Sequence, residues 1–400
     1  MRSDHEMTIG RISRRHLLQG AASLALGGLV TGCGGGDTAL RVRLLHRSLP
    51  QQLVGDFQRT LAERVGVEVR PERSLQAIAT LLEQWQAIAQ GDVAPLPNWR
   101  RWVPFVEKPV APVAHLVTLG DAWLAGAIQA GAIAPLALEE LDHWPQLPAR
   151  WQALVRRDDQ GDLAATGQLW GAPYRWGTTA IAYDRTQFAK LGWEPQDWAD
   201  LWRPELRERV AVVDQPREVI GFTLKKLGHS YNTPDLGAIP ELAAELQALQ
   251  PQIRLYNSVD YLQPLLLKDV WVVVGWSPDL LAAQSRYPQI VTVVPPSGTA
   301  LWADVWVQPA AARGDRDLAQ RWIDFCWQGR AAQKISRFSE GISPLLWEVE
   351  RASLPEVLRS PSARFPAADL LDRSEFLEPL TATAQVQYET LWRELRGGAT

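Results

Sequence analysis

The sequence has few cysteines, no excess of positive charge and no surplus of glycine or proline. Its 41 lysines and arginines are outnumbered by 45 aspartates and glutamates, so the formal charge is −4. A chain of this charge lacks the electrostatic footprint of a nucleic-acid-binding protein. Its 29 glycines and 28 prolines are too few for a low-complexity or disordered chain. A length of 400 residues therefore fits two substantial folded domains.

The sequence motifs of several common enzyme classes are also missing. No G-x-S-x-G, P-loop, G-x-G-x-x-G or H-E-x-x-H pattern occurs. Beyond the first 32 residues only four histidines remain, far apart and without a pairing motif: His46, His115, His143 and His229. We expect them to be structural, and we expect no metal, no cofactor and no enzyme, although distant residues can still assemble a catalytic triad.

Residues 1–32 have the pattern of an export signal. A stretch with three arginines precedes an apolar run at 17–30, which is too short and too rich in glycine and alanine to span a membrane. Residues 13–18, S-R-R-H-L-L, resemble the twin-arginine signal, with leucine where that pattern often has phenylalanine. An ordinary secretory signal also carries arginines, so both export routes stay open.

A cysteine follows where this signal should be cleaved. Residues 30–33, V-T-G-C, resemble the lipobox of bacterial lipoproteins, and a glycine-rich tether at 33–38 follows. The resemblance implies a lipid on the Cys33 thiol, which would anchor the protein at the extracytoplasmic face of a membrane without crossing it. Cys326 would then lack a partner for an intrachain disulfide. Removal of residues 1–32, with four arginines against two acids, takes the charge from −4 to −6.

Beyond the tether, short apolar strands alternate with helical segments. This alternation predicts α/β layers around largely parallel sheets. The proline-rich stretch 95–112 interrupts it and predicts a surface loop, or a lid or docking loop because it contains Trp99 and Trp102. Asp121 is expected to cap the helix that follows it. Strands are predicted at 40–45, 67–69, 116–119, 272–275, 290–294 and 301–307. Helices are predicted at 50–64, 75–90, 122–130, 216–227 and 317–327.

Tryptophan is abundant, and its 19 residues exceed the 7 tyrosines and 8 phenylalanines combined. We expect most of the indoles in the core. In the predicted strand 301–307, however, one face is aliphatic and the other carries Trp302, Asp304 and Trp306. A carboxylate between two indoles suits a cationic ligand. The alternative is that these tryptophans pack under a helix.

Three further side chains are candidates for the same site. Trp276 ends a predicted strand, and Trp176 precedes a G-T-T sequence. Glu218 is the third residue of its predicted helix, where a glutamate commonly reaches back to the N-cap backbone. Its alternative role is to bind a cation.

Residues 170–183, W-G-A-P-Y-R-W-G-T-T-A-I-A-Y, resemble the P-Y-x-W-G-T-T/A segment of bacterial spermidine/putrescine-binding proteins. These are the extracytoplasmic solute receptors of ABC importers. The resemblance covers residues 168–345 and is vaguer over 39–70 and 115–140. It continues in W-A-D-L-W at 198–202, P-R-E-V at 216–219, Y-N-S at 256–258, G-W-S at 275–277 and L-W-A-D at 301–304.

This resemblance implies an α/β, type II periplasmic-binding-protein-like fold of two lobes. Each lobe is a mixed sheet flanked by helices, with the ligand cleft between them, and an ABC permease recognises the closed form. We expect lobe 1 to comprise 39–181 plus 301–344 and lobe 2 to comprise 182–300 plus 345–400. The strand crossovers are expected near 181–184 and 295–301.

The resemblance also implies a set of ligand-binding residues and a small cationic amine as the ligand. Trp276 and Trp302 match aromatic residues that sandwich the polyamine chain, and Trp176 and Trp306 are further candidates for the cleft wall. Glu218 and Asp304 match carboxylates that bind its ammonium groups.

Three positions depart from the pattern of these proteins. Arg47 lies where the first strand commonly carries an aromatic and an acidic residue, and Gln215 replaces an acid, although Asp214 is adjacent. Where these proteins have a Ser-x-Tyr segment, this chain has G-D-A at 120–122, which contains Asp121. These departures favour a shorter or less charged amine, or a zwitterionic or anionic ligand that engages Arg47. The alternatives are a receptor for an amino acid, sugar or iron, and an interaction lipoprotein that has lost its ligand.

Overall fold

The structure is a computed structural model that describes residues 38–63, 65–91, 111–314 and 316–397. The predicted export signal at 1–32 and the predicted lipidation site Cys33 lie outside the described residues, as does the stretch 95–110 of the proline-rich segment. Within the described residues, none of the helices combines the length and the apolar character that a membrane span requires.

One mixed sheet of eleven strands runs through the described residues in the order β2-β1-β3-β12-β7-β10-β8-β9, with β4 and β13 beside β12 and β11 beside β7. The pairs at both ends of this order are parallel, whereas β12 and β7 run antiparallel to each other and to β3 and β10. The sheet is therefore mixed, not largely parallel as the alternation alone predicts. On the β1 side the strands are β1 (Thr38–Leu45), β2 (Gly66–Glu72), β3 (Leu116–Gly120), β4 (Ile133–Ala134), β7 (Ala172–Asp184), β12 (Ala300–Pro309) and β13 (Glu375–Phe376). On the β8 side they are β8 (Val210–Val212), β9 (Ile253–Tyr256), β10 (Val272–Trp276) and β11 (Ile290–Val293), and β5 (Arg156–Arg157) pairs separately with β6 (Gln168–Leu169).

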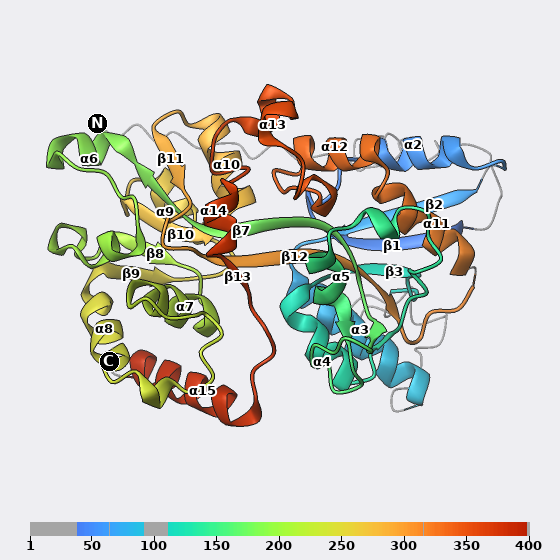
Figure 1. The fold of residues 1–400 in the computed structure, drawn as a ribbon, viewed down its shortest axis with the longest axis horizontal. Helices are drawn as coiled ribbons and strands as arrows, with labels where there is room; N and C mark the ends of the chain where they lie inside the picture. The colour runs from blue at the N-terminus through green and yellow to red at the C-terminus, as the bar shows by residue number, and fades with distance from the viewer. Residues whose placement is uncertain (1–37, 64, 92–110, 315, 398–400) are drawn as a thin grey trace, which may run out of the picture. The chain divides into compact units, whose positions relative to one another are not determined.

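The long strand β7 joins the two halves of this sheet (Figure 1). Its residues up to Thr178 pair with β12, and from Thr179 onward they pair with β10 and β11. All 13 residues of β7 are buried, because the strand has packed neighbours along its whole length. The change of partners, between Thr178 and Thr179, lies about three residues before the strand crossover expected near 181–184.

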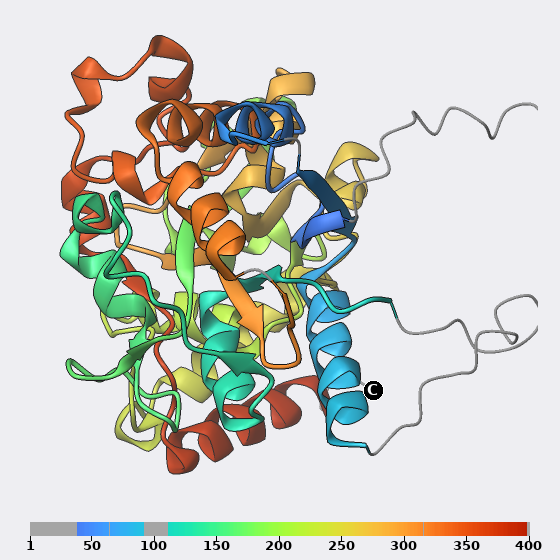
Figure 2. The same ribbon diagram turned by 90° about the vertical axis from the view of Figure 1, so that its right-hand side faces the viewer.

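Helices cover both faces of the sheet. Figures 1 and 2 show α2 and α12 together over one face of the β1 half, with α3 over the other, and Lys334 of α12 forms an ion pair with Asp56 of α2. Around the β1 half lie α2 (Gln52–Thr60), α3 (Leu75–Gln90), α4 (Leu124–Gln129), α5 (Ala149–Val155), α11 (Arg316–Cys326), α12 (Gly329–Phe338) and α13 (Glu356–Arg359). The short helix α14 (Ala368–Asp372) lies between the halves, with Leu371 in an apolar cluster of the β1 half and Leu370 against one of the β8 half. Around the β8 half lie α6 (Arg185–Leu191), α7 (Pro216–Lys226), α8 (Leu242–Leu249), α9 (Gln263–Leu266), α10 (Ser277–Arg286) and α15 (Ala382–Gly397).

Buried apolar side chains gather on both halves of the sheet. One cluster draws its residues from 40–176 and 301–376, and two others draw theirs from 180–300 and 363–395. Burial of this apolar area is the main favourable contribution to folding. The prediction was that most tryptophans lie in the core, and among the described residues nine of 17 are buried, which is a narrow majority. The buried indoles are those of Trp85, Trp144, Trp151, Trp170, Trp176, Trp198, Trp306, Trp322 and Trp327.

The predicted elements are confirmed where their signals are local. The helix predicted at 75–90 has those bounds, because the Ser74 side chain accepts the Ala77 N–H and Gly91 adopts the left-handed conformation that ends a helix. The predicted cap at Asp121 is wrong. A 3₁₀ turn (Asp121–Trp123) precedes α4, and the Asp121 carboxylate instead accepts the N–H of Ala303.

Candidate functional site

The candidate site lies where β7 changes partners, and the strand register places its side chains on one face. Directly paired residues of antiparallel strands project to the same side of a sheet, as do alternate residues along one strand. On β7 this face carries Arg175, Gly177 and Thr179. Asp304 pairs with the first of these, Trp302 with the second and Trp276 with the third. At about 3.3 Å per residue, the two ends of this row are about 13 Å apart along the strand.

Glu218 reaches the Thr179 end of this row from α7. The helix begins at Pro216, so Glu218 lies in its first turn, where the helix dipole favours a carboxylate. Its side chain does not cap the helix. It is 5% exposed, one carboxylate oxygen accepts the Thr179 hydroxyl at 2.9 Å, and the other has no hydrogen-bond partner among the described residues. A buried carboxylate oxygen without a donor is the acceptor that a cationic ligand requires.

Burial is the main reason that the pKa of Glu218 is raised from its ordinary value to about 7. The Thr179 hydroxyl, Arg217 and the Trp276 side chain lower this pKa, whereas the charge of Asp121 raises it. The group is therefore poised to lose its proton near neutral pH, and an ammonium group brought beside it would favour the charged carboxylate.

Two indoles flank the row. Trp276 ends β10, is partly exposed, and packs edge-on against Tyr261 with 5.7 Å between ring centroids. Trp302 lies directly over Gly177, since a Cβ added there would come within 2.4 Å of the Trp302 ring. The indole N–H of Trp302 is buried and without a partner among the described residues. Glycine at position 177 therefore allows the ring to lie against the strand backbone.

At the other end of the row Asp304 is bonded to Arg175. The guanidinium Nε donates to a carboxylate oxygen at 2.7 Å, and a second guanidinium nitrogen lies 2.5 Å from the same oxygen. Both side chains are buried, at 6% and 3% exposure. Burial raises the pKa of Asp304, and the charge of Arg175 opposes that effect. For Arg175, burial lowers the pKa, but the Asp304 charge prevails and the net direction is upward.

Asp121 is a further buried carboxylate near this face. One oxygen accepts the Ala303 N–H at 2.8 Å, and the other has no partner within the described part of the chain. Burial raises its pKa to about 7, while the Ala303 N–H and the charge of Arg157 lower it. It acts electrostatically on Glu218, so the two acids belong to one charged neighbourhood.

The remaining predicted site residues lie elsewhere. The Trp176 indole is in the packed interior, tilted against Trp151 at 5.7 Å and edge-on to Trp347 at 4.8 Å. Trp306 is also buried and stacks on Tyr174 with 4.2 Å between ring centroids. Neither indole therefore lines an open surface in this structure.

Two polar candidates are exposed. Gln215 is the N-cap residue of α7, and its side chain makes no capping hydrogen bond. Arg47 lies in the turn after β1 with a φ of 64°. The structure does not bring either side chain into the row of side chains on β7, β10 and β12.

Sequence reasoning missed two charged residues of this neighbourhood. Arg175 lies inside the segment that carries the family resemblance, and an arginine in an otherwise apolar strand is itself a signal that a buried acid must face it. Asp279, in the first turn of α10, is exposed and accepts the Tyr261 hydroxyl at 2.7 Å. Its charge acts on both members of the buried ion pair.

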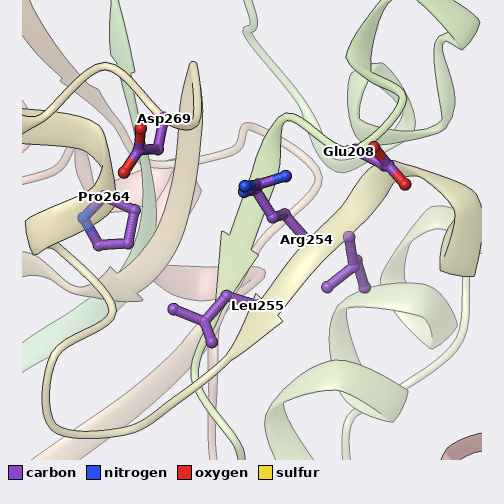
Figure 3. Close-up of a pocket in the computed structure, with 6 residues that line it drawn as sticks. Glu208, Arg254, Leu255, Pro264 and Asp269 are labelled. Atoms are coloured by element: carbon purple, nitrogen blue, oxygen red, sulfur yellow. The ribbon is translucent and has the colours of Figure 1, made fainter.

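A separate surface hollow lies beside β9, the last strand in the sheet order. It has a volume of about 340 Å³ and is lined by Glu208, Ile253, Arg254, Leu255, Pro264 and Asp269. Figure 3 shows the Arg254 side chain between Glu208 and Asp269. None of the predicted ligand-binding residues lines it. Among the described residues, no group of three or more potential metal ligands is placed to hold an ion.

Comparisons with known proteins support a solute-binding role. Residues 111–372 match the family model for bacterial extracellular solute-binding proteins. A putrescine/cadaverine-binding protein of Pseudomonas aeruginosa is 31% identical over 58% of this chain and 67% of its own length. A spermidine/putrescine-binding periplasmic protein of Haemophilus influenzae is 29% identical over 65% of this chain and 69% of its own.

A solved structure confirms the predicted fold class. The spermidine/putrescine ABC transporter substrate-binding protein PotD of Streptococcus pneumoniae superimposes with a TM-score of 0.71 at 19% identity, covering 90% of this chain and 98% of that one. The fold is thus the α/β fold of type II periplasmic binding proteins.

Proposed function

Because the chain belongs to the family of bacterial extracellular solute-binding proteins, we propose that it captures a small amine of the putrescine/spermidine class outside the cytoplasm. It would deliver this ligand to the permease of an ABC importer. The named relatives bind putrescine, cadaverine or spermidine. Within this chain the proposal is carried by the buried Glu218 carboxylate, which has one oxygen without a donor among the described residues.

The surroundings of Glu218 suit an ammonium group attached to an aliphatic chain. The free carboxylate oxygen would accept ammonium N–H donors. The Trp276 and Trp302 rings lie on the same face and would contact the methylene groups and attract the positive charge. An overall negative charge favours the approach of cations.

Ligand-induced stabilisation tests this proposal. Putrescine, cadaverine or spermidine should raise the melting temperature of the purified protein in proportion to the logarithm of ligand concentration. Glu218→Gln should abolish the shift, whereas Glu241→Gln, an exposed glutamate on the same half, should preserve it. Glucose and glutamate serve as control solutes. A flat response to all amines would refute the proposal, and a shift with a control solute would favour a receptor of the same family for that solute.

We further propose that the two halves of the sheet are the lobes of a hinged receptor. The change of β7 partners between Thr178 and Thr179 supports this boundary, as does the separation of the apolar clusters. Hinge closure over a ligand would bring the faces that carry Trp302 and Trp276 together. Small-angle X-ray scattering should show a smaller radius of gyration with bound amine. An unchanged radius with saturating amine would refute closure.

We also propose that the protein is exported and anchored by a lipid on Cys33, in keeping with the extracellular family. The lipobox-like residues 30–33 and the arginines at 14 and 15 support this proposal. Expressed in a bacterium, the protein should incorporate labelled palmitate and partition with membranes, and Cys33→Ala should abolish both. Replacing both arginines with lysine should block export by the twin-arginine route; continued export would favour the general secretory route.

A further inference from the structure

The Arg175 guanidinium is bound to Asp304, one of the two carboxylates that the family resemblance leads us to expect as partners of a ligand's ammonium groups. It contacts the Asp304 carboxylate through two nitrogens. A third nitrogen donates to the backbone carbonyl of Ser339 at 3.2 Å, and the group lies 5.5 Å from the centroid of the Trp302 ring. A carboxylate, a carbonyl and an indole face are the three partners that a buried organic cation seeks.

The surrounding backbone is shaped to hold Arg175 in this position. Its aliphatic stem packs against Gly341, where an added Cβ would come within 2.5 Å of the Arg175 Cγ. Its Cα is paired directly with that of Asp304 across the β7–β12 ladder. The side chain is 6% exposed. The guanidinium is therefore enclosed on several sides, unlike an exposed arginine that solvent can readily draw away.

The two ends of the row of side chains differ in whether their carboxylate is already neutralised by a cation. At the Thr179 end, Glu218 retains a carboxylate oxygen without a donor in the described structure. At the Arg175 end the Asp304 charge is already neutralised by a two-nitrogen contact. An ammonium group could reach Asp304 only by displacing a guanidinium that would be left buried and unpaired, which is strongly unfavourable.

We propose that Arg175 is a specificity-determining residue that substitutes for a second ligand ammonium group, so that the site recognises a single ammonium through Glu218. This inference rests on the proposed amine-binding function and narrows it. The ligand class becomes an amine with one recognised cationic end, and further positive charges add nothing to affinity at the Asp304 end.

Two ligands of equal chain length test the inference. Putrescine carries two ammonium groups and 1-aminobutane carries one. In isothermal titration calorimetry the wild-type protein should bind putrescine no more than about threefold more tightly than 1-aminobutane, close to the twofold statistical advantage of two equivalent ends. A preference for putrescine of thirtyfold or more would overturn the inference while leaving the proposed function intact. Binding of neither amine nor of spermidine would refute both.

Variants at the ion pair separate its role from that of Glu218. Arg175→Met should free Asp304 and raise the preference for putrescine over 1-aminobutane at least tenfold, and adding Asp304→Asn should remove that gain. Arg175→Lys, which keeps a cation, should retain the weak preference of the wild type. An Arg175→Met protein that is folded by circular dichroism and shows no gain would overturn the inference.

Arg175→Met leaves a buried acid unpaired, and the protein could fail to fold. The double variant Arg175→Met/Asp304→Asn, which removes both charges and leaves no member of the pair buried and unpaired, then provides the deciding measurement. Its affinity for putrescine should remain within threefold of the wild type if Arg175 neutralises Asp304. A tenfold or greater loss would show that Asp304 binds the ligand directly and would overturn the inference. Glu218→Gln should abolish binding of both amines in the protein that retains Arg175 and Asp304.

Discussion

Replacing Glu218 with glutamine should make the ligand-free protein more stable at alkaline pH and unable to bind amines. The amide retains the shape of the side chain and an oxygen that can accept the Thr179 hydroxyl, but it carries no charge. The wild-type carboxylate is buried with one oxygen that has no donor in the described structure. Its charge is therefore a cost to the folded protein until a cation arrives.

The magnitude follows from the pKa of this carboxyl group, which burial raises from 4.5 to about 7. A carboxyl with a raised folded-state pKa binds its proton more tightly in the folded chain than in the unfolded chain. The protonated carboxyl group therefore stabilises the folded protein relative to the charged form. This contribution to the free energy of unfolding is fully present below pH 4.5 and is lost as the pH rises through 7. At about 1.4 kcal/mol per pKa unit, the charged group costs roughly 3 kcal/mol at pH 8.

Urea denaturation between pH 5 and pH 8 measures this effect. The difference in unfolding free energy between Glu218→Gln and the wild type should grow with pH, from a small value at pH 5 to about 3 kcal/mol at pH 8. Glu241→Gln should show no such trend, since that side chain is exposed. With saturating putrescine the wild type should gain stability, and the Glu218→Gln protein should not.

Two results would refute this reasoning. A Glu218→Gln protein that is less stable than the wild type at pH 8 would mean that the carboxylate is well partnered in the ligand-free protein. Unchanged putrescine affinity would mean that the ligand does not bind beside Glu218. The first result would refute the electrostatic argument about the ligand-free protein, and the second would refute the location of the binding site. The two parts of the prediction can therefore be refuted independently.

Three further predictions concern the same neighbourhood. Because an amine ligand keeps its proton up to about pH 10, putrescine affinity should rise about tenfold per pH unit below the pKa of Glu218 and level off above it. Calorimetry in buffers of different ionisation heat should detect proton release on binding below pH 7, and a flat affinity profile from pH 5 to pH 8 would exclude Glu218 as the partner. Gly177→Ala should displace the Trp302 ring, because the new Cβ would lie 2.4 Å from it; putrescine affinity should fall at least tenfold, and an unchanged titration would remove that indole from the site. Gly221→Ala places a Cβ 1.9 Å from the Tyr231 ring and should lower the free energy of unfolding by about 1–3 kcal/mol or more, whereas a stability equal to that of the wild type in urea would contradict the packing described for α7.

Local sequence signals predicted much of the secondary structure. The helix from Leu75 to Gln90 was predictable because its apolar spacing, Ser74 at the start and Gly91 at the end all lie within a few residues of one another. The helix predicted at 122–130 was found at Leu124–Gln129, but the cap predicted at Asp121 was wrong for the opposite reason. The carboxylate bonds to the N–H of Ala303, 182 residues away, and no local pattern reports such a contact.

Long-range pairing also decided which tryptophans reach the candidate site. By sequence, Trp302 matched a sandwiching aromatic residue and Trp176 was a further candidate. In the structure Trp176 packs against Trp151 in the interior. Trp302 lies over Gly177 on the β7 face that also carries Thr179, the hydrogen-bond partner of Glu218. Alternation along a strand shows which residues share a face. It does not show which face a neighbouring helix or strand will cover.

By itself, the sequence determined the α/β class, the position of several strands and helices, and a family resemblance carried by short motifs in a constant order. Those properties depend on local periodicity and on residue types, which a sequence contains directly. Only the tertiary structure decided the charge balance of the site. Asp304 pairs with Arg175 because β12 and β7 place these two residues, 129 positions apart in the chain, directly opposite each other. Glu218 is left as a buried acid with an oxygen that lacks a donor among the described residues, at the face that carries Trp276 and Trp302.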